Sequence, residues 1–115
     1  MRRTLLLCIA LALGATLTAQ TRYIALEQIA VAGTAIGFTA ATITPPGQPM
    51  ATQAVCRART AEMSWRVDGG TPTSTVGTLI EVGEVLVITG HDNLVRFKAI
   101  RTGSSGSLDC TVSAQ

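Results

Sequence analysis

The segment from Cys56 to Thr102 constrains the fold most, because it consists of short apolar alternations with turns between them. In Met63–Asp68, apolar and polar side chains alternate strictly, which is the period of a strand with one buried face. A turn rich in Gly and Pro follows at 68–73, and two further apolar runs come after it. The pattern predicts a small β domain and contains no catalytic motif.

The rest of the chain shows the same organisation. Its 115 residues are enough for one domain. The Pro-rich stretch Thr42–Gln53 is predicted to be a loop, because prolines cannot donate to a ladder. The run Val85–Ile88 is apolar throughout, which predicts a strand covered on both faces. We expect strands at 21–31, 35–39, 54–61, 63–68, 78–82, 85–88, 94–102 and 108–113, with turns at 83–84, 90–93 and, as a hairpin, 103–106. This predicts an all-β fold without a long helix: a single small β-sandwich or jelly-roll-like domain of about seven or eight strands.

The N-terminal residues have the layout of a secretory signal peptide. Met1–Arg3 is positively charged, Leu5–Ala15 is apolar, and the residues at 17–19 suit a cleavage site after Ala19. An uncleaved membrane anchor is the alternative, but the apolar run is shorter than the roughly 20 residues that a spanning helix needs. We therefore divide the chain into a signal peptide at 1–19 and a β-sandwich domain at 20–115. The mature domain is expected to be secreted or periplasmic, without stable membrane insertion.

The basic character of the chain comes from this leader. There are nine Lys and Arg against seven Asp and Glu, and Arg2 and Arg3 leave with the leader, so the mature domain is formally neutral. A neutral domain gives no electrostatic reason to expect a nucleic acid as partner. Six of the seven remaining basic residues are interleaved with acidic ones, and we interpret them mainly as solvated strand faces: Arg57, Arg59, Arg66, Arg96, Lys98 and Arg101.

Two cysteines, Cys56 and Cys110, remain in the mature domain. Each lies in a predicted strand on the side of its apolar neighbours, so both are expected to point inward. In an oxidising compartment two such cysteines predict a disulfide, which adds about 4 kcal/mol of stability on the chain-entropy model. Two buried free thiols are the alternative, because the sequence does not show how closely the two Cα atoms approach.

The polar residues do not form a pattern that catalysis or metal binding requires. His91 is the single histidine and lies in a Gly-His-Asp-Asn turn, and no serine lies in a nucleophile elbow. One histidine and two distant cysteines lack the spacing of zinc ligands, and the carboxylates near Asp68 and Asp92 are too few for calcium. We therefore expect no enzyme activity, no metal and no cofactor. Trp65 is expected in the core and Tyr23 at the surface.

Several motifs from Cys56 onward carry a resemblance to a known family. They are CRARTA at 56–61, MSWRVDGGTPT at 63–73, GEVL at 83–86 and FKAIRTG at 97–103. Together they resemble a small β domain of tailed-phage structural and virion-associated proteins, which implies a virion-surface or particle-associated role. The signal peptide and Cys110 depart from that pattern and fit an exported, disulfide-linked version of the domain. The shorter stretch Trp65–Thr73 is similar to a turn of chitobiase-type C-terminal sandwich domains, which are accessory modules of extracellular glycosidases.

The resemblance and the lack of a catalytic motif indicate a non-enzymatic structural or surface-binding module for assembly, decoration or adhesion. We expect protein partners or self-association through two loops, Thr42–Gln53 and Asp68–Val76. The residues expected to contact a partner are Pro45, Pro46, Gln48, Asp68, Thr71 and Thr73. The alternative is an accessory carbohydrate-binding module of an extracellular system, whose partner is a carbohydrate.

Overall fold

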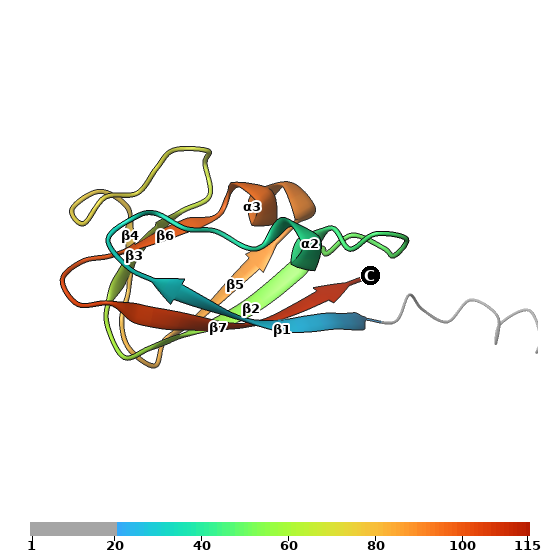
Figure 1. The fold of residues 1–115 in the computed structure, drawn as a ribbon, viewed down its shortest axis with the longest axis horizontal. Helices are drawn as coiled ribbons and strands as arrows, with labels where there is room; N and C mark the ends of the chain where they lie inside the picture. Colours follow the sequence, from blue (N-terminus) through green and yellow to red (C-terminus); the bar gives the residue numbers. More distant parts are fainter. Residues whose placement is uncertain (1–20) are drawn as a thin grey trace, which may run out of the picture.

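Two antiparallel sheets form the structure, a computed structural model in which residues 21–115 are described (Figure 1). Seven strands and two short helices follow one another in this part of the chain: β1 (Arg22–Val31), α2 (Ala40–Ile43), β2 (Gln53–Arg59), β3 (Met63–Arg66), β4 (Thr78–Ile80), β5 (Val85–Thr89), α3 (His91–Arg96), β6 (Lys98–Arg101) and β7 (Gly106–Ala114). The expected all-β class is confirmed. The predicted signal peptide and its cleavage site lie outside the described residues.

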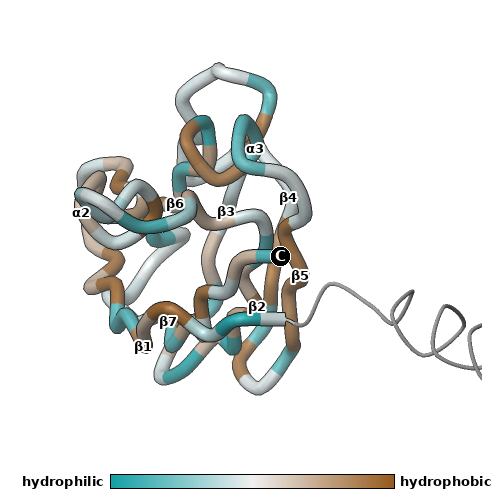
Figure 2. The backbone as a smooth tube through the Cα atoms, turned by 90° about the vertical axis from the view of Figure 1, so that its right-hand side faces the viewer, coloured by the Kyte–Doolittle hydropathy of each residue, from teal (hydrophilic) through white to brown (hydrophobic). Residues whose placement is uncertain are grey.

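The four-stranded sheet has the order β1-β7-β2-β5, and the three-stranded sheet has the order β4-β3-β6. The three-stranded sheet and both helices lie on one side of the four-stranded sheet (Figure 2). Burial along β2 alternates: Ala54, Cys56 and Ala58 are buried, whereas the residues between them are exposed. Because directly paired residues of neighbouring strands share a face, the whole sheet has an inner face and an outer face.

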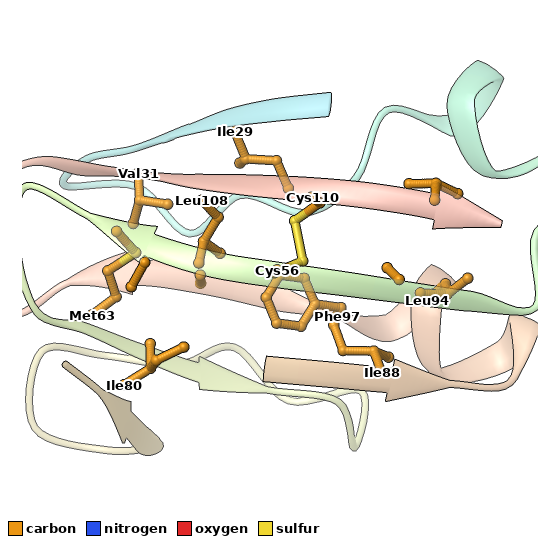
Figure 3. Close-up of a cluster of buried hydrophobic side chains, with 14 of the residues drawn as sticks. Ile29, Val31, Cys56, Met63, Ile80, Ile88, Leu94, Phe97, Leu108 and Cys110 are labelled. Atoms are coloured by element: carbon orange, nitrogen blue, oxygen red, sulfur yellow. A yellow bond between two sulfur atoms is a disulfide. The ribbon is translucent and has the colours of Figure 1, made fainter. Parts of the chain in front are cut away.

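Buried side chains fill the space between the layers (Figure 3). Phe97 is buried where α3 meets β6, and its ring centroid lies 5.3 Å from that of Phe38 and 6.2 Å from that of Trp65. Tilted ring pairs at these separations make favourable contacts. Trp65 therefore packs against the core, as the alternation in β3 predicts. Tyr23 is exposed, which is also the expected position.

Cys56 and Cys110 form the expected disulfide, between β2 and β7 (Figure 3). The two residues stand directly opposite each other in the ladder, and their Cα atoms are 4.0 Å apart. Both are fully buried on the inner face. The bond therefore joins the two central strands of the four-stranded sheet, which come from positions separated by 54 in the sequence.

The strand predicted at 35–39 is wrong. This segment makes one isolated bridge, between Ile36 and Ala99. A Cβ atom at Gly37 would collide with the Phe97 carbonyl oxygen, so the backbone lies directly on the start of β6 instead of extending a sheet. The helix α2 follows, so the predicted loop Thr42–Gln53 begins inside a helical turn.

The prediction that Val85–Ile88 is covered on both faces is also wrong. β5 is an edge strand of the four-stranded sheet, and Val85 and Val87 are exposed on its outer face. Ile88 is buried on the opposite face, and Leu86 packs partly against the core. The run is continuous because apolar residues occupy the solvent side of β5 as well as its core side.

The turn predicted at 90–93 and the strand predicted at 94–102 are replaced by α3 followed by the shorter β6. The Asn93 side chain donates to the Thr89 carbonyl (2.8 Å), and Leu94 is buried beneath the helical turn.

The predicted hairpin at 103–106 is wrong as well, because this turn connects β6 in one sheet to β7 in the other. Likewise, the chain crosses from β2 to β3 between the sheets after Thr60, whose φ is 78°.

Breaking the disulfide is expected to lower the free energy of unfolding by about 4 kcal/mol, because the reduced denatured chain regains the freedom of a long closed loop. Urea unfolding with and without reductant measures this loss. The variant C56A/C110A is the control, and its urea midpoint should not change with reductant. Equal stability of the oxidised and reduced wild type would contradict the prediction, as would alkylation of both thiols without reductant.

Candidate functional site

The loop that follows β3 is anchored by a bidentate ion pair. Arg66, at the end of β3, donates from Nε to Oδ1 of Asp68 (2.9 Å) and from Nη2 to Oδ2 (2.6 Å). The Gly70 backbone N–H also donates to Oδ1 (3.1 Å), and Gly69 has a φ of 87°, which only glycine adopts without strain. The Asp-Gly-Gly sequence is thus the turn that its residues predict.

These contacts shift the pKa of Asp68 to about 2, from an ordinary value of 3.8. The hydrogen bonds from Arg66 are the largest cause, and the Gly70 N–H adds to them because it also favours the charged carboxylate. The pKa of Arg66 is raised by the same pair. The Arg66 guanidinium and the Asp68 carboxylate are therefore both charged at the start of the loop, and their charges cancel.

The far end of the loop is fastened to β3. The Thr73 N–H donates to the Val76 carbonyl (2.9 Å), and the Val76 N–H donates to Thr73 Oγ1 (3.0 Å). The buried Ser64 hydroxyl donates to the same Val76 carbonyl (3.2 Å). Gly77, with a φ of 143°, lies against Ser64 so closely that no Cβ fits. The loop is therefore held at both ends while Thr71 and Thr73 stay exposed.

Two open hollows border this loop. One, of about 330 Å³, is lined by Trp65, Arg66, Val67, Asp68, Gly77 and Thr78. The other, of about 460 Å³, lies beside residues 73–74 of the loop and is lined by Gly33, Thr73, Ser74 and residues 100–103. Both are within the size range of small-ligand sites. Of the residues predicted to contact a partner, Asp68 and Thr73 line these hollows.

The second predicted loop lies elsewhere. Pro46 and Gln48 are exposed and Pro45 is half-buried, and the Gln48 N–H donates to the Pro45 carbonyl (3.3 Å). In Figure 1 this green loop is at the right-hand end of the domain, whereas the olive loop that contains Asp68 is at the left. The structure therefore places the two sets of predicted contact residues at opposite ends instead of in one site.

His91 has a structural environment. Its Nδ1 lies 2.9 Å from the Ala51 carbonyl oxygen, a distance at which Nδ1–H donates to that oxygen. Its Nε2 lies 3.5 Å from the Thr44 hydroxyl. The imidazole thus connects the start of α3 to the Pro45-containing loop. Within residues 21–115 no three His, Cys, Asp or Glu side chains gather as metal ligands would, and no helix there is long and apolar enough to cross a membrane.

The outer face of the four-stranded sheet carries a feature that the sequence interpretation missed. One row of directly paired residues crosses all four strands: Leu26 on β1, Thr111 on β7, Val55 on β2 and Val87 on β5. Val85 lies next to this row. The exposed fractions are 76% for Leu26, 41% for Val55, 52% for Val85 and 52% for Val87. We call these four aliphatic residues the outer stripe.

Charged residues adjoin the outer stripe. The next row pairs Gln28, Asp109, Arg57 and Val85 across the same four strands. Asp109 accepts a hydrogen bond from Arg59 at Oδ2 (2.8 Å), while its Oδ1 is buried and has no hydrogen-bond partner among the described residues. Arg57 makes no ion pair within residues 21–115. The alternation of side chains along β2 and β7 predicts that each strand has an outer face. Only the pairing of the strands shows that these outer residues lie together on one surface.

Comparison with protein-family models, with curated proteins and with solved structures found no match to this chain.

Replacing Arg66 by Gln is expected to raise the pKa of Asp68 from about 2 toward 3.8, because the two guanidinium hydrogen bonds are lost. The folded-state pKa is depressed, so the stability from the pair is present above pH 3.8 and is lost as the pH falls through about 2. An NMR titration of the side-chain carboxyl carbons measures this. R101Q is the control, since Arg101 bonds to Ser105 instead; an unchanged Asp68 pKa in R66Q would contradict the assignment.

Replacing Gly77 by Ala is expected to destabilise the fold by about 1–3 kcal/mol, since a φ of 143° strains any residue with a Cβ. The new methyl group would also displace the Ser64 hydroxyl from the Val76 carbonyl. G103A is the matched control, because a Cβ at Gly103 meets open space. Thermal and urea unfolding compare the two variants, and equal stability would show that the Gly77 contact does not hold the loop.

Proposed function

We propose that this chain is an exported, non-catalytic module that binds a protein surface in assembly, decoration or adhesion. The outer stripe is the observation that carries this proposal. Burial of apolar surface contributes about 25 cal/mol per Å², and a monomer gains nothing from leaving four aliphatic side chains together in water. A partner surface that covers the stripe would recover that free energy.

Two features support the compartment and the absence of chemistry. A buried disulfide between central strands is typical of proteins that fold in an oxidising compartment. The single histidine is engaged with a backbone carbonyl rather than with a nucleophile. Attachment to a virion or another particle rests on the resemblance of the Cys56–Gly103 motifs to tailed-phage proteins.

A carbohydrate-binding module is the second candidate, and one hollow favours it. The half-buried Trp65 lines that hollow beside the Arg66–Asp68 pair. An aromatic side chain next to fixed polar groups can offer apolar contact and hydrogen bonds to a sugar. This site is separate from the outer stripe, so the two candidates can be tested independently.

The test expresses the tagged full chain in its source organism and separates unbound protein from cells and particles on a density gradient. The fraction of the tagged protein that is bound to cells or particles is measured. We expect wild type to be bound, and V55K/V87K to lower the bound fraction about tenfold or more, because each buried lysine costs at least about 1.4 kcal/mol. The control V95K changes an exposed valine (58%) on α3, outside the outer stripe, and should bind as wild type does.

Wild type found wholly in the free fraction would overturn the proposal. Titration with soluble β-linked oligosaccharides, followed by the NMR signal of the Trp65 indole, tests the second candidate in parallel. Binding that V55K/V87K leaves intact and D68N weakens would favour the carbohydrate module instead.

A further inference from the structure

The outer face has a layout that complements itself. Across the sheet, the order of strands is β1, β7, β2 and β5. Reversing this order places β1 opposite β5 and β7 opposite β2. A two-fold axis in the plane of the interface, parallel to the strands and between β7 and β2, produces that reversal in a pair of identical chains.

We infer that two copies of this chain pair through their outer faces about this axis, an inference that rests on the proposed function and names its partner. In this arrangement Leu26 faces Val87 of the second copy, and Thr111 faces Val55 of the second copy. An isologous interface contains every such contact twice. The outer stripes of both copies are then covered at once.

The charges fit the same axis. It places Asp109 opposite Arg57 of the second copy and Arg59 opposite Ser107, so no like charges meet. Arg57 has no ion-pair partner among the described residues, and Asp109 has an oxygen without a hydrogen bond there. Rotation of the carboxylate about its soft terminal torsion would offer one oxygen to Arg59 and the other to the incoming Arg57.

The perpendicular axis fits poorly. A two-fold axis that crosses the strands lays each strand over its own copy. When such an axis passes through the row of Val55, Arg57 lies opposite Gln53 of the second copy and Asp109 lies opposite Ser113. Neither charge then meets a partner of opposite sign. The axis parallel to the strands is the one that brings Asp109 and Arg57 together.

The size of the face suits a reversible dimer. Four strands at about 4.8 Å and seven residues at about 3.4 Å give a footprint on the order of 450 Å² for each copy. Because projecting side chains add to this flat area, two such faces together bury about 1,000 Å², which is the lower limit for a specific interface. We therefore expect dimers that dissociate on dilution rather than a permanent assembly.

Sedimentation equilibrium of the purified protein over a range of concentrations tests the pairing. We expect a concentration-dependent shift from monomer to dimer mass. V55K/V87K should raise the dissociation constant about tenfold or more, whereas V95K should leave it unchanged. Circular dichroism spectra confirm that each variant is folded. Wild type that stays monomeric at millimolar concentration would overturn the inference, and so would a dimer that V55K/V87K leaves intact, which would point to pairing through a sheet edge.

Cross-linking tests the axis. In one copy Leu26 and Val87 are three strands apart, about 14 Å. In the inferred dimer they face each other across stacked sheets about 10 Å apart, which is too far for a direct disulfide, so a short thiol-reactive bismaleimide should link L26C/V87C into a covalent dimer on a reducing gel. L26C and V87C alone should not. Mass spectrometry checks that Cys56 and Cys110 remain paired; a double variant that dimerises reversibly without cross-linking would overturn this axis.

The two proposals can fail separately. If wild type is monomeric but V55K/V87K still lowers the particle-bound fraction, the partner is a different protein and the proposed function stands. If wild type dimerises but is never found on cells or particles, self-association stands and the role in assembly falls.

Discussion

The pairing of β2 with β7 is the constraint on which the rest of the molecule depends. Side chains alternate between the faces of a strand, so a slip of one residue would exchange the inner and outer faces completely. The Cys56–Cys110 bond lies at this pairing and fixes its register covalently. Core packing, the outer stripe and the charges beside it all follow from that single alignment.

Strands in which apolar and polar residues alternate strictly could be predicted from the sequence. Segments whose apolar residues do not reflect one buried strand face could not. β2, β3 and β7 could be expected because apolar and polar residues alternate along them in the sequence. Val85–Ile88 misled because its solvent side is also apolar. The 35–39 segment misled because its β-compatible residues lie on the backbone of Phe97 instead of in a ladder. Local composition reports neither an edge position nor an exposed apolar face.

The candidate sites show the same division. The Asp68 turn could be predicted because its residues interact within a few positions of one another. The outer stripe comes from three strands that are far apart in the sequence, so only the ladder reveals it. Its individual residues are unremarkable: a valine or leucine in a strand usually points inward. Their exposure became meaningful when pairing placed them in one row.

The two loops at opposite ends of the domain have a consequence for valency. With the axis parallel to the strands, the inferred dimer would present two copies of the Asp68 loop at one end and two copies of the Pro45 loop at the other. The two ends of such a dimer would differ from each other, and each end would be bivalent. Weak contacts made by one loop would then be strengthened by avidity on a repetitive surface, and a shell or cell wall with repeated sites would retain the dimer where it releases the monomer.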